Sequence, residues 1–528
     1  MPRLLIGRIA LLVLISGGGA MAQVPDGLLT VAERSGFKAT ALHSDVVALA
    51  EALAKASPLV RLVELGRSGE GRSLPLLIVA DPPVASAEAA RASGKVVVFL
   101  FGNIHAGEVC GKEALPILVR EIVAEAHPKL LEHLILLVAP IYNADGNERV
   151  ARTNRPGQVG PEEGMGIRAN AQGLDLNRDY MKLEARETRA LVGLLNEWDP
   201  HLTIDTHATN GSYHRYILTY EGAKNPAGDR RLIEFSRRAL FPEVGRAFEA
   251  KSGRKAFHYG NFEDDHARWA SFPATPRFGT TYVGLRNRLS ILTEAYSHAP
   301  FDFRVFATRD YCRAALEFAS SHRDAIRALL GSARRDAITA GLDPRGDDHV
   351  AIRSRPRALP GKVDVLGFVE RAEGGRSVAT DEPRDYRCDV EIDFIPALSV
   401  PRPFAYLIPP GPGVAAAVEV LRAHGIEVEI TKESARREVE VERIDAFSRS
   451  RRPFEGHQLV EVIGSATRTE PRDLPAGTAL IPTAQALGSL AVTLLDARSD
   501  DGLLTWGHFA DCLGDRKDYP VLRLGRKP

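Results

Sequence analysis

The stretch His105-Ala106-Gly107-Glu108 decides how this sequence is interpreted, because it directly follows the mostly apolar run Lys95–Phe101. That run is bounded by Ser93-Gly94 and Gly102-Asn103, which is typical of a strand buried on both faces of a parallel sheet. Ligands and catalytic groups gather at the carboxyl ends of such strands. Imidazole and carboxylate groups are good zinc ligands, so His105 and Glu108 form a candidate metal-binding pair. The HxxE spacing also occurs by chance, so its position directly after a buried strand is what makes it informative.

A third candidate ligand, His207, ends a second strand-like segment. His201–His207 is rich in β-forming residues and follows Trp198-Asp199-Pro200, a break after a helical stretch. A catalytic zinc site has about three protein ligands and leaves one position for water, so His105, Glu108 and His207 would make such a set. Taken alone, His207 would be interpreted as a surface-loop histidine, and Asp205 as a polar strand residue paired with backbone groups.

A candidate general base, Glu294, lies near the end of the mostly apolar segment Leu289–Tyr296. Burial on such a strand raises the pKa of a carboxyl group toward working pH. A base beside a zinc-bound water molecule is what metal-assisted hydrolysis requires. The alternative is a strand-end carboxylate paired with Arg286 or Arg288.

Short motifs follow one another through the first part of the chain: Gly66–Arg72, Gly102–Glu108, Asn143-Ala144-Asp145-Gly146, Asp175-Leu176-Asn177-Arg178, His207 and Thr293-Glu294. In content and order they resemble the M14 (carboxypeptidase A-like) zinc metallocarboxypeptidase family. The third motif departs from the N-P-D-G of the family at Ala144. A single such motif is weak, but six in the right order make chance similarity improbable.

The resemblance implies a role for each matched residue. It implies one Zn²⁺ per chain, held by His105, Glu108 and His207, with Glu294 as general acid and base. It also implies that Arg152 polarises the scissile carbonyl, that Asn177 and Arg178 bind the C-terminal carboxylate of the substrate, and that Asp175 accepts a ring N–H of His105. The tyrosine that closes over substrate in the family has no clear match, and Tyr259 and Tyr282 both lie nearby.

The fold expected from these patterns is α/β: three α/β/α layers around a mixed, mostly parallel sheet, followed by a smaller β-rich C-terminal domain. The resemblance implies zinc-dependent hydrolysis of the C-terminal bond of peptides, by zinc-activated water, on substrates with a free C-terminal carboxylate. Three alternatives stay open. One is an amidohydrolase for murein peptides or acyl-amino acids on the same fold, and another is an inactive peptidase-like binding protein. The third is a C-terminal domain that binds carbohydrate or cell wall, which the absence of clustered aromatic residues in its sequence does not favour.

The N-terminus has the features of a secretory signal peptide. Arg3 and Arg8 precede the apolar core Ile9–Ile15, and Ala20-Met21-Ala22 matches an A-x-A cleavage site, so cleavage is expected after Ala22. No later segment is long enough to cross a bilayer, and we expect no stable membrane anchor after cleavage. The expected location is periplasmic or extracellular. With 68 basic and 68 acidic residues and no basic stripe, nucleic acid is not an expected partner.

The chain of 528 residues is long enough for at least two domains. We expect a signal peptide at 1–22, the catalytic domain at 23–335, a Pro-punctuated charged linker at 336–361 and an accessory domain at 362–528. The pattern predicts a helix over Phe303–Leu330 that ends at Gly331. The four widely spaced cysteines allow one or two disulfides but form no zinc motif.

Overall fold

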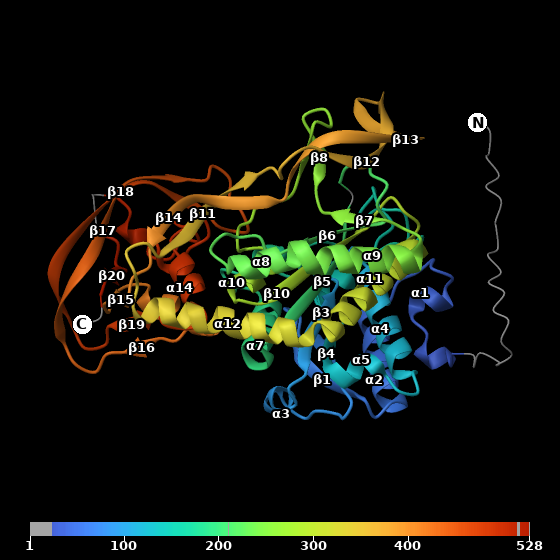
Figure 1. The fold of residues 1–528 in the computed structure, drawn as a ribbon, viewed down its shortest axis with the longest axis horizontal. Coiled ribbons are helices and arrows are strands. Elements are labelled where there is room, and N and C mark those ends of the chain that lie inside the picture. Colours follow the sequence, from blue (N-terminus) through green and yellow to red (C-terminus); the bar gives the residue numbers. More distant parts are fainter. Residues whose placement is uncertain (1–23, 210, 515–517, 527–528) are drawn as a thin grey trace.

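The structure, a computed structural model, describes residues 24–209, 211–514 and 518–526 (Figure 1). The signal peptide expected at 1–22 lies outside these residues. Within the described ranges, no helix combines the length and the apolar character that a membrane span needs.

The centre of the molecule is an eight-stranded mixed sheet, counted within the described residues. Neighbouring strands follow the order β1 (Val60–Arg67), β2 (Ser73–Val79), β4 (Leu134–Ala139), β3 (Val96–Gly102), β5 (Leu202–Thr209), β10 (Leu289–Tyr296), β6 (Leu218–Gly222) and β7 (Ala256–His258). The four central strands β4, β3, β5 and β10 are parallel to one another. Their carboxyl ends therefore meet at one edge of the sheet, where a site is expected.

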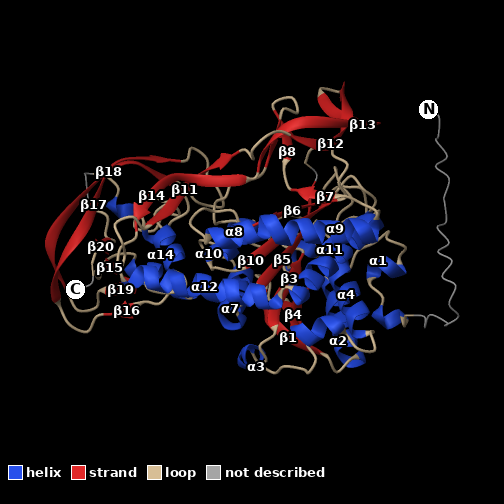
Figure 2. Ribbon diagram, in the orientation of Figure 1, coloured by secondary structure: helices blue, strands red, loops and turns tan. Residues whose placement is uncertain are grey.

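Helices cover both faces of this sheet (Figure 2). They are α1 (Val31–Arg34), α2 (His43–Ala56), α3 (Ala87–Ala92), α4 (Cys110–Val123), α5 (Lys129–His133), α6 (Ala144–Asn147), α7 (Arg186–Trp198), α8 (Arg230–Phe235), α9 (Phe241–Ser252), α10 (Gly279–Leu285), α11 (Phe301–Ser321) and α12 (Arg323–Leu342). Strand β3 shows the layering. Val97, Phe99 and Phe101 join the apolar cluster that contains α7 and α10, whereas Val96, Val98 and Leu100 join the cluster that contains α4 and α11. The expected three-layer α/β/α arrangement is confirmed.

The segment after residue 300 differs from its prediction. Two helices, α11 and α12, replace the single helix expected over Phe303–Leu330, and Gly331 lies inside α12. His322 between them has a non-helical backbone (φ −104°, ψ 14°), which explains the break. Part of the expected linker 336–361 is also regular structure, since α12 runs to Leu342 and a strand occupies His349–Arg357. An interior glycine costs a helix only about 1 kcal/mol, so packing overrides the stop signal.

The C-terminal region is β-rich, as expected, and it borders the catalytic part along its length (Figure 1). Two of its strands, β11 (His349–Arg357) and β14 (Asp393–Pro401), form an antiparallel pair. A second sheet has the order β16 (Glu429–Ile430), β19 (Ala479–Pro482), β15 (Ala405–Ile408), β20 (Leu522–Leu524), β17 (Ala435–Arg449) and β18 (Val460–Leu474), together with helices α13 (Val414–Ala423) and α14 (Gly488–Leu495).

One sheet is shared between the two parts of the chain. The long hairpin of β12 (Val363–Glu373) and β13 (Arg376–Glu391) pairs in parallel with β9 (Arg268–Ala270), which pairs with β8 (Asn261–Glu263). Strands β8 and β9 belong to the catalytic part by sequence. The C-terminal region is therefore joined to it by backbone hydrogen bonds as well as by side chains.

Candidate metal centre and substrate cavity

Three neighbouring strands bring the candidate metal ligands and Glu294 together. His105 lies just after the end of β3, and Glu108 lies in the turn before α4. His207 lies on β5, whose Thr206 pairs with Gly102 at the end of β3. Because β5 and β10 are parallel and in register, Glu294 on β10 lies directly opposite His207. The three ligands are buried, each at most 3% exposed.

The two imidazoles face the same carboxylate. His105 Nδ1 lies 2.9 Å from Glu108 Oε1, and His207 Nδ1 lies 2.8 Å from Glu108 Oε2. One ligand atom from each residue lies within 4.8 Å of the other two. Two nitrogens and one carboxylate group at this spacing are the donor set of a catalytic zinc site.

Each imidazole has an aspartate on its outer side, hydrogen-bonded to the ring of His105 and in close ionic contact with the ring of His207. His105 Nε2 lies 3.0 Å from Asp175 Oδ1, and His207 Nε2 lies 2.9 Å from Asp205 Oδ2. Such carboxylates fix the ring orientation and tautomer of a metal-binding histidine and make its other nitrogen more basic. Asp175 lies where the resemblance places it. Asp205 was missed, although its spacing of two residues from His207 on one strand puts both side chains on the same face.

Buried charges shift the protonation of this cluster. Burial raises the pKa of Glu108, but the positive charges of His105 and Arg155 and its hydrogen bonds hold that pKa well below its usual range. Burial lowers the pKa of His207, but the charge and hydrogen bonding of Asp205 and Glu108 raise it well above its usual value. The carboxylates of this cluster are therefore negatively charged and favour a positive charge between them. Such an environment suits a bound cation.

Glu294 has the environment expected of a general base. Burial raises the pKa of this carboxyl to about 8, the charge of His207 opposes the rise, and those of Glu108 and Asp205 add to it. Among the described residues, Glu294 Oε2 is buried without a hydrogen-bond partner. Its predicted alternative partners are engaged elsewhere, since Arg288 contacts Asp199 and Arg286 contacts Asn196. Glu294 is thus an acid that lines the cavity and whose carboxylate is not held by an arginine.

The ligands open into a cavity of about 320 Å³. Its wall contains His105, Glu108, Arg155, Arg168, Asn177, Arg178, Ala208, Thr209, Gly211, Tyr259, Phe272, Phe278, Leu292 and Glu294. The Gly- and Pro-rich segment 154–166 forms part of its rim, because Arg155 Nη2 donates to Glu108 Oε1 at 2.6 Å and Gln158 Nε2 donates to the Gly107 carbonyl at 3.0 Å.

Arg152 does not lie where the resemblance places it. Its side chain is exposed, and it is not among the residues that line the cavity. The chain turns at residues 152–154 and directs Arg155 inward instead. Arg168 also lines the cavity, with Nη1 3.8 Å from Glu108 Oε1 and Nε donating to Asp175 Oδ2 at 2.8 Å. In this structure Arg152 therefore lies outside the cavity, whereas Arg155 and Arg168 line it.

Asn177 and Arg178 both line the cavity, in a short 3₁₀ turn (Leu176–Arg178). Asn177 Oδ1 accepts the Gly279 N–H at 2.9 Å, which leaves its amide nitrogen toward the cavity for an acceptor. Arg178 lies 4.2 Å above the ring of Phe278, and Nη1 donates to the Asn177 carbonyl at 2.8 Å. A guanidinium held in this way presents its remaining N–H groups to an anion.

The structure separates the two candidate tyrosines. Tyr259 lines the cavity, where burial raises the pKa of its hydroxyl to about 12. Tyr282 is fully buried in the core, with its hydroxyl 2.8 Å from His424 Nδ1. Of the two, only Tyr259 can contact a ligand in this cavity.

Two of the matched motifs act as scaffold. Ser68 Oγ and Arg72 Nη1 both donate to Asp145 Oδ1 at 2.6 Å, so the first and third motifs lock onto each other. Asn143 Nδ2 donates to the Ile104 carbonyl at 3.3 Å, beside His105. Cys110, Cys312 and Cys388 are buried thiols, and Cys110 Sγ packs against the His207 carbonyl.

Comparison with known proteins agrees with this geometry. Residues 46–267 match the family model described as zinc carboxypeptidase. Carboxypeptidase 2 of Trichophyton rubrum is 24% identical over 494 residues, which cover 89% of this chain and 84% of that protein. Carboxypeptidase D of Mus musculus is 34% identical over 147 residues, 25% of this chain and 11% of that protein.

Solved structures with partial similarity include a metallo-carboxypeptidase from Burkholderia cenocepacia (TM-score 0.38, 19% identity, 52% of this chain and 69% of that chain). Another is a metallo-carboxypeptidase from Pseudomonas aeruginosa in complex with (2-guanidinoethylmercapto)succinic acid (TM-score 0.39, 19% identity, 54% of this chain and 69% of that chain). Because these TM-scores are low, the fold of this chain is described from its own sheet order.

Proposed function

We propose that this chain is a zinc metallopeptidase that removes the C-terminal residue of peptides that end in a free carboxylate, and the match of residues 46–267 to the zinc carboxypeptidase family model supports this proposal. The observation that carries this proposal is one cavity that joins the His105, Glu108 and His207 cluster to Asn177 and Arg178. The sequence of residues 1–22 supports a periplasmic or extracellular location.

The side chains fit one zinc ion. His105 Nδ1, His207 Nδ1 and Glu108 face one another, while Asp175 and Asp205 occupy the outer nitrogens of the two rings. Without a metal, the buried carboxylates of Glu108, Asp175 and Asp205 lie close together. A bound divalent cation would reduce the repulsion between their negative charges. Zinc in such a site supplies a Lewis acid that polarises a carbonyl group and makes water more acidic.

The remaining residues have separate tasks. Asn177 and Arg178 hold the terminal carboxylate, and this anchoring places the last peptide bond over the ligand cluster. Glu294 accepts a proton from water at its carboxylate and passes it to the departing amine. Arg168 faces the position where negative charge grows on the carbonyl oxygen, and its N–H groups stabilise that charge. Tyr259 contacts the bound peptide at the rim of the cavity.

The test compares two N-blocked peptides that differ only in a free or amidated C-terminus. We expect mass spectrometry to show loss of one C-terminal residue from the free acid, at least about tenfold slower cleavage of the amide, and no cleavage after chelation. Added zinc should restore activity. Equal cleavage of both peptides would contradict the carboxypeptidase proposal and favour an endopeptidase or an amidohydrolase.

A further inference from the structure

A loop of the C-terminal region reaches the wall of the substrate cavity. The loop joins β17 to β18, and Glu455 at its tip accepts the Asp175 N–H on Oε2 at 2.8 Å. Two residues later, His457 Nε2 lies 2.6 Å from Glu184 Oε1. Asp175 is the residue that orients His105, and Asn177 and Arg178 follow it directly. The loop therefore touches the segment on which both metal binding and carboxylate binding depend.

The backbone at Glu455 indicates that its side chain is needed there. Its φ is +48°, in the left-handed region, and Gly456 follows at +82°. A residue other than glycine or asparagine is disfavoured in this region. A simple turn would favour glycine or asparagine at both positions. The carboxylate contact with Asp175 gives a physical reason for a glutamate.

A segment of the C-terminal region that contains Asp501 and Trp506 is fixed to the catalytic part beside this loop. The backbone N–H of Arg277 donates to Asp501 Oδ2 at 2.7 Å, and Asp501 is fully buried. The Arg277 guanidinium lies 4.9 Å from the ring of Trp506 and 5.3 Å from that of Phe454, the neighbour of Glu455. These contacts hold the loop against the segment that leads to Phe278 in the cavity wall.

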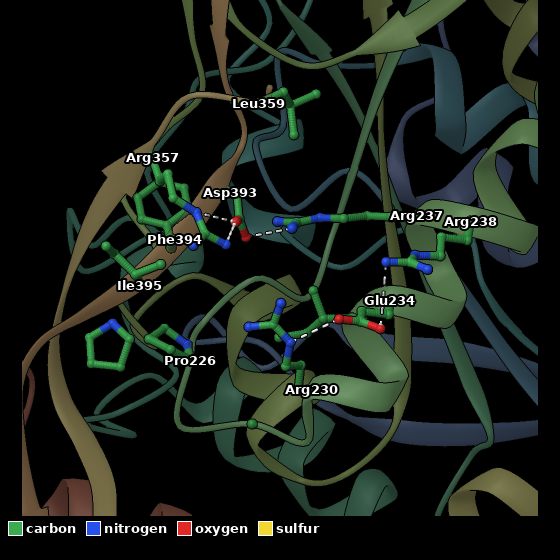
Figure 3. A pocket seen from close by; sticks show the side chains of 13 residues that line it. Pro226, Arg230, Glu234, Arg237, Arg238, Arg357, Leu359, Asp393, Phe394 and Ile395 are labelled. Atoms are coloured by element: carbon green, nitrogen blue, oxygen red, sulfur yellow. Dashed lines mark hydrogen bonds and ion pairs between the residues drawn. The ribbon is translucent and has the colours of Figure 1, made fainter. Parts of the chain in front are cut away.

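Contacts far from the loop hold the same two parts together. Figure 3 shows Asp393 of β14 between Arg237, which lies between α8 and α9, and Arg357 of β11. Leu194 of α7 and Leu421 of α13 belong to one continuous apolar cluster. The position of Glu455 is thus set by an extended interface rather than by one flexible loop.

The charges around Arg178 match this arrangement. Burial lowers the pKa of Arg178, the negative charges of Asp175 and Glu455 oppose this, and the positive charges of Arg168 and Arg277 add to it. Glu455 is therefore close enough to influence the guanidinium that we propose binds the substrate. It acts through Asp175 and Arg178 and is not among the residues that line the cavity.

From these contacts we infer that the C-terminal region completes the active site, with Glu455 as a positioning residue that holds residues 175–178 in the geometry that binds the terminal carboxylate. This inference rests on the proposed function for the role of Arg178. The match to Carboxypeptidase 2 of Trichophyton rubrum, at 89% of this chain, is too long to be confined to the catalytic part, which is consistent with the two parts acting as a unit.

Three variants of the full chain test the inference. Glu455→Ala removes the acceptor, whereas Glu455→Gln keeps an acceptor oxygen at the same reach. Glu438→Ala removes an exposed glutamate of β17 and is the control. Each variant is measured in two ways. Steady-state kinetics use an N-blocked dipeptide with a free C-terminus, and mass spectrometry follows hydrogen exchange of the peptide that contains Asp175.

We expect Glu455→Ala to raise KM at least about fivefold with kcat within about twofold, because the acceptor of the Asp175 N–H is lost while Glu294 and the ligands are unchanged. Exchange at the Asp175 amide should be at least about tenfold faster. Glu455→Gln and Glu438→Ala should resemble the wild type in both measurements, and all variants should have zinc contents like that of the wild type.

Unchanged KM and exchange in Glu455→Ala would overturn the inference, as would a Glu455→Gln variant as impaired as Glu455→Ala. A fall in melting temperature with a uniform rise in exchange across the protein would also count against it, since it would indicate a stability role only. If the wild type cleaves no free-acid peptide, the proposed function fails, and the exchange measurement still decides whether Glu455 holds residues 175–178.

Discussion

Glu294 lies opposite His207 on the neighbouring strand but is not one of the candidate metal ligands. A variant of Glu294 can therefore separate the proton transfer assigned to it from metal binding. We expect Glu294→Gln to lower kcat by roughly two to four orders of magnitude, the usual contribution of a general acid and base. Zinc content and substrate KM should stay near those of the wild type. Near-normal turnover in this variant would show that another group takes the proton.

In metal-free protein, Glu294→Gln should raise the free energy of unfolding by an amount that depends on pH. Burial raises the pKa of Glu294 from its usual 4.5 to about 8, so the folded state binds a proton that the unfolded state releases between these values. The cost to stability is absent below pH 4.5, grows as the pH rises and is complete above about pH 8. Glu294→Gln should therefore stabilise the chelated protein little at pH 4.5 and by more than about 1 kcal/mol at pH 8.5. Denaturant unfolding at both pH values checks this, and an equal effect at both would contradict it.

Arg168 and Arg152 form a matched pair of arginines, one that lines the cavity and one that is exposed outside it. Loss of a donor to a developing oxyanion costs about 10²- to 10³-fold in kcat. We expect a loss of this size in Arg168→Ala and a change of less than about twofold in Arg152→Ala. The kinetics of both variants on one peptide settle the assignment, and the reverse order would restore the prediction for Arg152.

The candidate site residues that could be selected from the sequence are those whose position relative to an apolar strand is clear. His105, His207 and Glu294 each end or follow an apolar strand, and parallel strands bring such positions to one edge of a sheet. Arginine gave no such signal, because 68 basic residues are spread along the chain and the segment 152–168 is irregular. Its path is set by contacts such as that of Arg155 with Glu108, which the local sequence does not encode.

At the scale of elements, Asp145 is the acceptor that locks the Ser68–Arg72 turn onto α6. Its side chain is fully buried, so its removal leaves several donors without a partner. We expect Asp145→Ala to lower the free energy of unfolding by about 2–4 kcal/mol. Asp364→Ala, which removes an exposed ion pair with Arg387, is the control and should change it by less than about 1 kcal/mol. A similar small change in both, measured by denaturant unfolding, would refute the scaffold role.

Strands were predicted best where burial is continuous. Segment 289–296 was expected as a strand and is β10, and the run before His105 is β3. Helix ends were predicted less well, because capping and tertiary packing override local signals. Gly331 remains helical since α12 packs on α8 and α14, which lie far apart in sequence.

At the scale of the whole molecule, the catalytic sheet and the C-terminal region share both a sheet and an apolar cluster. The sequence predicted the β-rich character of residues 362–528 but not this attachment. Pairing between β13 and β9 joins segments about 120 residues apart, and a single sequence carries no local signal for such long-range contacts. The division into domains at 335 and 362 remains a prediction.

Zinc content is the most direct test of the central claim, that His105, Glu108 and His207 hold one catalytic zinc ion. We expect elemental analysis of protein purified without added metal to find close to one zinc per chain, and we expect His207→Ala to lose it. Ligand distances of about 2.0–2.2 Å should follow from X-ray absorption at the zinc edge. Less than about a tenth of an equivalent, with none taken up on addition, would contradict the account.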